Sequence, residues 1–340
     1  MRKDQTLKTD ADWMRRAIAL SIKGFPAPNP HVGCVLVKDG EAVGEGWCPY
    51  AGGPHAEAMA LSKAGPEAKG ATAYVTLEPC NHFGRTPPCS LALIHAEVAR
   101  VIVAVRDQNP RAIGGAERLR EAGIPVEIGL MAEEAAQENR AFLFAVQEKR
   151  PWVVAKAGAS LDGRIALPSG ESQWITSSAA RRKGHRLRAE LGAVLVGRQT
   201  VEADNPHLTA RLPGIVNQPL RIVLDPSNRL TGKERVFDEA APTRHVTGPI
   251  DLPELLASLY AEGQIGLLVE GGALTIASFV RAGLVDRLEL FQAPKLLGNG
   301  PSWVGDFGLK TLADAPSLKI VRTKRLGPDL QITADLVRKV

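Results

Sequence analysis

Two stretches decide how the first half of the chain folds: PHAEA at residues 54–58 and TLEPCNHFGRTPPC at residues 76–89. They contain His55, Cys80 and Cys89, which together offer three ligands for Zn²⁺. A zinc ion with three protein ligands keeps its fourth tetrahedral position open for water, as catalytic sites do. Glu57 follows His55 by two residues, so on a helix it is turned away from a fourth ligand position. We predict that Glu57 carries protons beside the metal.

The local sequence places these residues at the ends of regular elements. Pro54 is typical of a helix start, and the helix AEAMALSKAG should end at Gly65. The apolar run AYVTL predicts a strand that delivers Cys80, while Pro87 and Pro88 predict a second helix with Cys89 in its first turn. The alternative is that these cysteines are ordinary buried residues or form disulfides. The polar N-terminus lacks a signal-peptide core, which disfavours an oxidising compartment.

The order H-x-E and then P-C…C is typical of zinc-dependent nucleobase deaminases. Their cysteines are usually separated by two residues, whereas eight separate Cys80 from Cys89. The longer loop carries His82 and Arg85, which could hold an anionic group. Two other polar loops adjoin predicted strands and are candidates for ligand binding, although each is also a common turn sequence. They contain Asn29 in PAPNPHVG, and Asp107 and Asn109 in VRDQNP.

Size and composition indicate a globular protein of two domains. The chain has 340 residues, of which 44% are hydrophobic and 23% charged. The net charge of +5 is mild and spread along the chain, so a solvated basic surface is favoured. Aromatic residues make up 5%, which disfavours a stacking platform for single-stranded nucleic acid. No apolar run is long enough to cross a bilayer. We expect a cytoplasmic protein with neither nucleic-acid nor membrane partners.

The first domain, residues 10–149, should alternate helices with strands. Thr9 and Asp12 form a capping-box pattern, and HVGCVLV and EAVGEGW read as a hairpin joined at Asp39-Gly40. Cys34 lies in the first of these strands and is interpreted as a buried residue. Later come VARVIVAV, GAERLREAG and PVEIG, then one long helix from about Met131 to Lys149. This order predicts helices on both faces of a mixed sheet.

The second domain, residues 151–340, begins after Arg150-Pro151 with the strand WVVAKAGAS. The runs LGAVLVG, LRIVLD, IGLLVEGG and RLELFQAP also read as strands, several of them buried on both faces. Glu270-Gly271-Gly272 precedes a helix, where backbone amides can approach a pyrophosphate. No G-x-G-x-x-G follows a strand, so the usual dinucleotide fingerprint is absent. Arg198 begins the turn after LGAVLVG and is a candidate to bind a cofactor phosphate, the alternative being that it points to solvent.

Together these motifs resemble the bifunctional riboflavin-biosynthesis deaminase/reductase family. The resemblance spans about residues 10–335 and rests on HAE, TLEPCNHFGRTPPC, VRDQNP, KAGASLDGRIA, SGESQWITS, TVEADNPHLTAR, VEGGALT and APKLLGNG. It implies an α/β fold in two parts: an N-terminal cytidine-deaminase-like α/β/α sandwich and a C-terminal dihydrofolate-reductase-like α/β domain. The first would deaminate a diamino-hydroxy-phosphoribosylamino-pyrimidine, and the second would reduce the product's ribose to ribityl with NADPH.

The resemblance also implies roles for individual residues. One zinc per chain would be held by His55, Cys80 and Cys89, with Glu57 as the proton carrier. The residues around the first substrate would be Asn29, His82, Arg85, Asp107 and Asn109. The reductase substrate would contact Ser172, Arg188, Leu208, Arg211 and Glu270. The residues implied to contact NADPH are Gly158, Trp174, Thr200, Asp204, Gly272, Ala273, Leu274 and Thr275.

Two departures from the family pattern stand out: Cys48 replaces a usual histidine, and Gln108 replaces a usual proline. The expected partners are small phosphorylated pyrimidines, and the sequence leaves homo-oligomerisation open. Two other classes of protein share some of these features. A tRNA adenosine deaminase would have closer cysteines and no reductase-like half. A non-enzymatic zinc-stabilised module would need a fourth ligand in place of Glu57.

Overall fold

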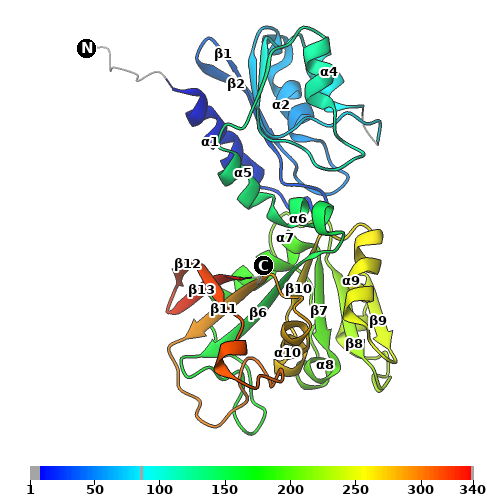
Figure 1. Cartoon of the computed structure of the whole chain (residues 1–340), viewed down its shortest axis with the longest axis vertical. Helices are drawn as coiled ribbons and strands as arrows, with labels where there is room; N and C mark the ends of the chain where they lie inside the picture. The colour runs from blue at the N-terminus through cyan, green and yellow to red at the C-terminus, as the bar shows by residue number, and fades with distance from the viewer. Residues whose placement is uncertain (1–7, 85–86, 338–340) are drawn as a thin grey trace, which may run out of the picture. The chain divides into compact units, whose positions relative to one another are not determined.

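The computed structural model of the protein describes residues 8–84 and 87–337 (Figure 1). It divides into two compact units that meet between Glu148 and Lys149. Each unit is α/β, as the sequence predicted.

The first unit is built on a five-stranded sheet of order β2-β1-β3-β4-β5. Its strands are β1 (Gly33–Lys38), β2 (Glu41–Trp47), β3 (Thr72–Leu77), β4 (Arg100–Val105) and β5 (Val126–Ile128). β1 is antiparallel to β2 and β3, whereas β3, β4 and β5 are parallel. The hairpin at Asp39-Gly40 is confirmed, and both residues have the positive φ angles (52° and 79°) that a type I′ turn requires.

Helices cover both faces of this sheet, which makes the predicted sandwich. α1 (Asp10–Ser21) and α5 (Ala132–Glu138) pack together on one face, against β1, β3 and β4. The helices on the other face are α2 (Ala56–Ala64), α3 (Cys89–His95) and α4 (Gly115–Glu121), with the short 3₁₀ turn η1 (Gly65–Ala68). The Thr9–Asp12 capping box is present at the start of α1. The apolar core between α1 and the sheet includes Trp13, Met14, Ala17 and Leu20.

Glycines in β2 allow α2 to lie directly on the sheet. A Cβ added to Gly46 would stand 2.0 Å from the carbonyl oxygen of Ala56, and one added to Gly44 would stand 2.2 Å from that of Ala60. Any side chain at these positions would push the helix away from the strand. The close approach fixes the start of α2, and with it His55 and Glu57.

The prediction of one helix from Met131 to Lys149 is wrong, because two helices meet at Asn139. α5 ends at Glu138, and α6 runs over Arg140–Glu148. Asn139 is buried, and its side chain accepts a hydrogen bond from the His31 N–H (2.7 Å) and donates one to the His31 carbonyl oxygen (2.8 Å). This pairing ties the helix junction to the segment that leads into β1.

The second unit is built on an eight-stranded sheet of order β12-β13-β11-β6-β10-β7-β8-β9. The parallel strands are β6 (Trp152–Ser160), β7 (Ala193–Gly197), β8 (Leu220–Asp225), β9 (Thr243–Thr247), β10 (Gly266–Val269) and β11 (Arg287–Ala293). Its helices are α7 (Ser178–Leu191), α8 (Arg198–Asp204), α9 (Leu252–Ala261) and α10 (Ala273–Arg281), with 3₁₀ turns η2 (Arg235–Phe237) and η3 (Leu312–Asp314). The core includes Leu195, Ile222, Leu256 and Phe279.

Three strands of this sheet were not among those predicted. β9 is polar and only half-buried, so it lacks an apolar run. β12 (Leu318–Leu326) and β13 (Asp329–Leu336) form an antiparallel hairpin at the edge next to β11. β12 is exposed along nearly its whole length and carries four basic side chains: Lys319, Arg322, Lys324 and Arg325. Alternation of apolar and polar residues, the usual sign of a strand, is therefore weak in β12.

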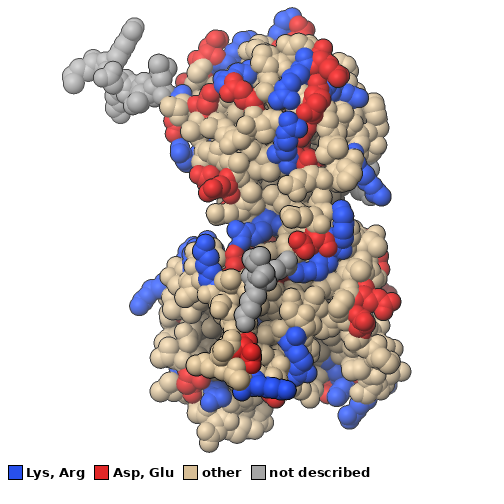
Figure 2. Space-filling view, viewed as in Figure 1, with Lys and Arg blue, Asp and Glu red and all other residues tan. Residues whose placement is uncertain are grey.

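On the face shown in Figure 2, basic and acidic side chains are interspersed over each unit, with no continuous cationic stripe. None of the helices in the described part of the chain combines the length and the hydrophobicity needed to cross a membrane.

Candidate active sites

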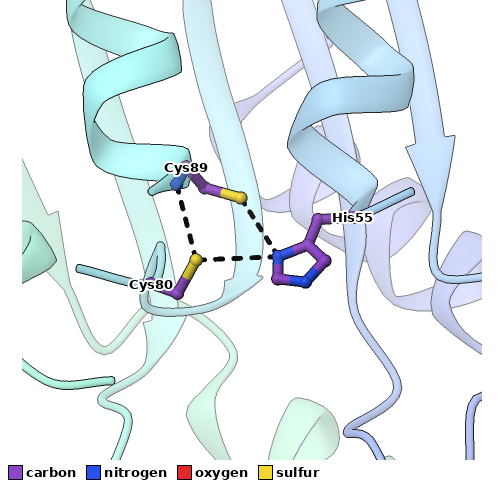
Figure 3. A group of neighbouring side chains, drawn as sticks. All are labelled: His55, Cys80 and Cys89. Carbon is purple, nitrogen blue, oxygen red and sulfur yellow. Dashed lines mark hydrogen bonds between the residues drawn. The ribbon is translucent and has the colours of Figure 1, made fainter. Parts of the chain in front are cut away.

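The three predicted zinc ligands come together in the first unit (Figure 3). His55 is the N-cap residue of α2, Cys80 follows the end of β3, and Cys89 is the first residue of α3. The Nδ1 atom of His55 lies 3.2 Å from Sγ of Cys89 and 3.6 Å from Sγ of Cys80. All three ligand atoms lie within 4.8 Å of one another. We call these residues the metal cluster.

The metal cluster fits zinc in both chemistry and spacing. Bonds of about 2.3 Å to sulfur and about 2.05 Å to nitrogen place the ligand atoms of a tetrahedral ion roughly 3.5 Å apart. The observed separations of 3.2 and 3.6 Å from nitrogen to sulfur agree with that geometry. The backbone N–H of Cys89 also points at Sγ of Cys80, 3.4 Å away. The start of α3 therefore favours a thiolate at Cys80.

Glu57 is buried beside the metal cluster, in the first turn of α2. Burial, followed by the neighbouring Cys80, raises the pKa of its carboxyl group to about 7. The pKa of Cys80 is lowered to about 4, first by a hydrogen bond from Cys89 and further by His55. Cys34 and Cys48 are both buried free thiols. Burial, followed by the charge of Glu57, raises the pKa of Cys48 to about 12.

The other residues expected around the first substrate are only partly assembled. Asp107 is buried, and its pKa is raised to about 6 by burial and by Glu78 and Cys80, which places it near the metal cluster. Its carboxylate accepts a hydrogen bond from the Asn109 N–H (2.8 Å). His82 is exposed on the loop between the two cysteines. Asn29 is exposed before β1, and no described contact joins it to the cluster. Arg85 lies outside the described residues.

Glu78 is a residue of this region that sequence reasoning passed over. It is buried, and its carboxylate accepts hydrogen bonds from the Asp107 N–H (3.3 Å) and from the Ala116 N–H at the start of α4 (3.0 Å). It thereby joins the end of β3 to the loop that carries Asp107. Its only signal in the sequence was its place in TLEPC, two residues before a metal ligand.

In the second unit, a largely buried charge cluster lies at the end of β10. Glu270 accepts hydrogen bonds from Arg188 Nε (2.6 Å) and Nη2 (3.0 Å), and from Lys156 Nζ (3.4 Å). Burial opposes ionisation of Glu270, but Arg188 and Lys156 nevertheless lower its pKa to about 2. Lys156 was missed in the sequence, although it is the single charged residue of the strand WVVAKAGAS.

The predicted cofactor residues group around the Gly271-Gly272 turn. Gly272 is the N-cap residue of α10, and its N–H donates to Thr200 Oγ1 (3.0 Å). A Cβ at Gly197 would meet Thr275 Oγ1 at 2.5 Å, so the end of β7 packs closely against α10. Paired glycines at a helix N-terminus fit an anionic pyrophosphate. Ala273 and Leu274 begin α10, and the Leu274 side chain is 61% exposed.

The segment 172–174 adjoins α8 through Asp204. Ser172 Oγ donates to Asp204 Oδ1 (3.0 Å), and the Trp174 side chain is 61% exposed. Trp174 stacks with the guanidinium of Arg181, whose carbon lies 4.5 Å from the ring centroid. Gly158 lies in β6, where an added Cβ would stand 3.2 Å from Thr176. The Trp174 ring therefore lies at the surface with the guanidinium of Arg181 over it, and does not pack in the core.

The remaining substrate residues lie on the segment between α8 and β8. Leu208 is buried, with a left-handed backbone (φ 56°). The carbonyl oxygen of Thr209 accepts hydrogen bonds from Arg188 Nη1 (2.9 Å) and His185 Nδ1 (3.1 Å). Burial and Arg188 lower the pKa of Arg211. Burial, then Arg188 and Arg211, lower the pKa of His185 to about 4. His185 thus lies beside Arg188 and Arg211. It was not singled out from the sequence.

Arg198 is mostly buried and pairs with two carboxylates. Its Nη1 lies 2.6 Å from a carboxylate oxygen of Glu202, and its Nε lies 3.5 Å from the buried carboxylate of Asp225. Whether Arg198 contacts a cofactor phosphate therefore stays a prediction. A cofactor phosphate would have to compete with two carboxylates for this side chain.

Comparison with known proteins agrees with the division of the chain into two units. Residues 7–105 match the model of the cytidine and deoxycytidylate deaminase zinc-binding region, and residues 151–332 match that of the RibD C-terminal domain. The chain is 44% identical to the riboflavin biosynthesis protein RibD of Escherichia coli, over 94% of this chain and 98% of that protein. It is 42% identical to RibD of Aquifex aeolicus, over 95% and 97% respectively.

Solved structures of similar proteins also match this chain over nearly its full length. Acinetobacter baumannii RibD superposes with a TM-score of 0.91 at 39% identity, covering 98% of this chain and 100% of that one. A Thermotoga maritima protein, named as a diaminohydroxyphosphoribosylaminopyrimidine deaminase/5-amino-6-(5-phosphoribosylamino)uracil reductase, has a TM-score of 0.87 at 36% identity, covering 96% and 99%.

Fold, site and comparisons together define a two-domain enzyme in which a cytidine-deaminase-like zinc-binding domain precedes a reductase domain. The chain belongs to the RibD family, the bifunctional deaminase/reductases of riboflavin biosynthesis.

Proposed function

We propose that the first domain deaminates 2,5-diamino-6-(5-phosphoribosylamino)pyrimidin-4-one and that the second reduces the ribosyl group of the product to ribityl with NADPH. The observation that carries the proposal is the metal cluster with Glu57 buried beside it, on a chain whose second half holds the Arg188–Glu270–Lys156 charge cluster. The two activities named for the Thermotoga maritima relative support these substrates.

In the deaminase, His55, Cys80 and Cys89 would hold one zinc ion. Zinc lowers the pKa of a coordinated water to about 7, which makes a nucleophile available near neutral pH. Glu57 takes a proton from the attacking water and delivers it to the ring nitrogen next to the amine-bearing carbon. It then protonates the departing amine. Asp107 and Asn109, with Asn29, His82 and Arg85, would bind the substrate around this centre.

In the reductase, bound NADPH supplies the hydride, which the anomeric carbon of the opened sugar accepts. The residues of the chain align and hold the two reactants. The cations Arg188 and Arg211 would bind the anionic substrate, and the ionised Glu270 would accept hydrogen bonds from its ribosyl hydroxyls. Ser172 and Leu208 complete the substrate contacts. Gly158, Trp174, Thr200, Asp204 and residues 272–275 would bind the cofactor.

The test is a titration of the purified full-length protein with NADPH and NADH, combined with elemental analysis. We expect one zinc per chain, saturable NADPH binding, and NADPH oxidation only when the deaminated substrate is present. A zinc-stabilised binding module or a tRNA deaminase would not bind NADPH. A preference for NADH would overturn the cofactor assignment but leave the deaminase half intact. A cytoplasmic location and small phosphorylated partners remain predictions.

A further inference from the structure

The largest fully buried side chain among the described residues is a charged one, Arg221 of β8. Its guanidinium is completely inaccessible to solvent. Burying a charge is unfavourable unless close partners compensate for the lost hydration. Arg221 contacts none of the residues proposed above to touch substrate or cofactor, so its burial requires another explanation.

The partners of Arg221 come from the segments before and after β8. Nη1 donates to the carboxylate of Asp238 (2.7 Å) and to the carbonyl oxygen of His207 (3.1 Å). Nη2 donates to the carbonyl oxygens of Asp238 and Ala241. The second carboxylate oxygen of Asp238 lies 2.8 Å from His207 Nδ1. Arg221 and Asp238 therefore hold His207 twice, through its backbone and through its ring. We call these three residues the anchor.

His207 belongs to residues 205–211, which we call the substrate loop because Leu208 and Arg211 lie on it. Leu208 has φ 56°, a left-handed conformation that a branched side chain adopts only when its surroundings hold it there. The residues on both sides of it are held by arginines: the carbonyl oxygen of His207 by Arg221, and that of Thr209 by Arg188. The unusual backbone of Leu208 thus lies between two residues whose carbonyl oxygens are held by the guanidinium groups of Arg221 and Arg188.

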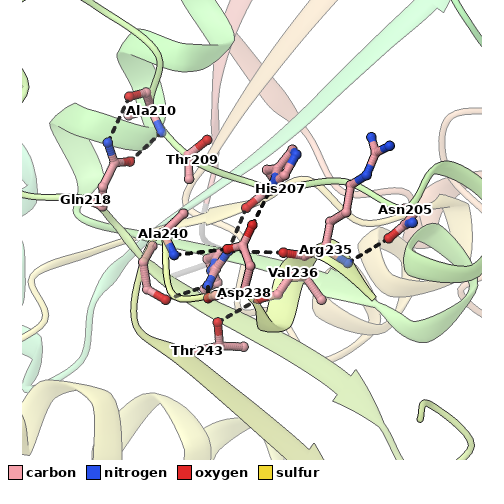
Figure 4. Close-up of polar contacts among 12 residues, drawn as sticks. Asn205, His207, Thr209, Ala210, Gln218, Arg235, Val236, Asp238, Ala240 and Thr243 are labelled. Atoms are coloured by element: carbon pink, nitrogen blue, oxygen red, sulfur yellow. Dashed lines mark hydrogen bonds and ion pairs between the residues drawn. The ribbon is translucent and has the colours of Figure 1, made fainter. Parts of the chain in front are cut away.

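Other contacts keep both ends of the substrate loop in place (Figure 4). The Asn205 side chain accepts a hydrogen bond from the Arg235 N–H (2.8 Å). The Gln218 side chain pairs with both the N–H (2.8 Å) and the carbonyl oxygen (3.2 Å) of Ala210. Between these ends, the anchor holds the loop at His207, through Arg221 of β8 and through Asp238. The loop is therefore held at Asn205, His207 and Ala210 as well as by Arg188 at Thr209.

We propose that Arg221 is a positioning residue of the reductase, which acts through Asp238 and His207 to fix the substrate loop so that Leu208 and Arg211 meet the phosphorylated substrate. The inference rests on the proposed reductase function. A planar guanidinium reaches the carboxylate of Asp238 and four carbonyl oxygens at once, that of Arg235 included, whereas a lysine ammonium keeps the charge but cannot span them. Arg221→Lys therefore separates the role of geometry from the role of charge.

The experiment compares three full-length variants with the wild type. Arg221→Lys removes the fork, and His207→Ala removes only a ring that is 44% exposed, so His207→Ala should fold normally. Arg287→Lys is the matched control, since Arg287 makes a similar two-point contact with Asp335 (2.7 and 3.2 Å) at the start of β11 and does not touch the loop. For each variant we would measure kcat and KM of the reductase for both substrates, the deaminase rate, and hydrogen exchange of residues 205–211.

Arg221→Lys should raise the KM for the deaminated substrate about tenfold or more and leave the KM for NADPH within about twofold. His207→Ala should act in the same direction but less strongly. Both should speed exchange in the substrate loop, while the deaminase rate and the Arg287→Lys variant stay at wild-type values. Wild-type loop exchange in both variants, or an equal rise in both KM values, would overturn the proposal. If the wild type did not reduce the deaminated substrate, the proposed function would fail, but loop exchange would still decide whether Arg221 fixes the loop.

Discussion

Glu57 is the residue that we propose as the proton carrier of the deaminase, and it lies beside the metal cluster without belonging to it. Its burial favours the neutral carboxyl group, and its place in the first turn of α2 is set by the contact between α2 and the glycines of β2. The motif H-x-E was enough to predict that Glu57 lies at the start of a helix beside the metal cluster, because helix geometry follows from short spacing in the sequence. Its exact surroundings were not predictable, since Cys34 and Cys48 approach from β1 and from the end of β2.

Glu57→Gln should lower deaminase kcat by ~10²-fold or more, because the amide cannot transfer protons. The variant should still bind one zinc per chain by elemental analysis, since the three ligands are intact. Glu67→Gln, an exposed glutamate in η1, is the matched control and should behave as wild type. Full turnover by Glu57→Gln would disprove the assigned role.

His185 should remain neutral well below the usual range for histidine. Burial and the neighbouring Arg188 and Arg211 hold its pKa near 4 in the folded protein. The unfolded chain, with a pKa near about 6.5, binds the proton first, so this residue should cost stability as pH falls from about 6.5 toward 4. Proton NMR of the imidazole signals, with His185→Gln to assign the peak, should show no titration of His185 between pH 5.5 and 8. A titration midpoint near the usual histidine pKa would show that Arg188 and Arg211 do not depress the pKa of His185.

At the scale of elements, the sequence indicated those that have a local signal. The Asp39-Gly40 hairpin, the capping box of α1 and the buried strands β7 and β10 all follow from short-range patterns. The break at Asn139 did not, because its partner His31 lies 108 residues away. β12 also escaped prediction, since both of its faces are exposed and no apolar periodicity marks it. The anchor is a similar case, because Arg221 reads as one polar residue in an apolar strand.

Asn139→Leu should destabilise the deaminase domain. The leucine leaves the N–H and carbonyl oxygen of His31 without the side chain that pairs with them, at a cost of about 1–3 kcal/mol for each buried group left unsatisfied. Urea denaturation should report a lower free energy of unfolding for this domain. Gln137→Leu, an exposed position on α5, provides the control and should change little. Equal stability of the two variants would show that the pairing does not hold the helix junction.

At the scale of the whole molecule, each unit holds its own core and its own set of proposed site residues. The metal cluster draws only on residues before Glu148, and the charge cluster only on residues after Lys149. The sequence placed this boundary near Arg150-Pro151, and the structure assigns Arg150 to the second unit. Its guanidinium binds both carboxylate oxygens of the buried Asp286, each at 2.7 Å.

Fragments 1–148 and 149–340 should therefore retain deamination and NADPH oxidation respectively. A fragment 151–340 should melt at a lower temperature, because it lacks the Arg150 side chain that pairs with the buried Asp286. In the full chain, Cys80→Ser should abolish deamination and leave NADPH binding unchanged. Loss of both activities in that variant would contradict independent domains.

β12 has a consequence for how the protein behaves in concentrated solution. A strand at the end of a sheet offers open backbone groups to any other strand, and basic side chains along it discourage such pairing. Lys319, Arg322, Lys324 and Arg325 give β12 this protection. It depends on charge, and the screening length falls from about 10 Å at 0.1 M salt to about 3 Å at 1 M. Colloidal stability should therefore decline as salt is added. Storage or crystallisation at high ionic strength would screen the charges on β12 and favour pairing between the edge strands of different molecules.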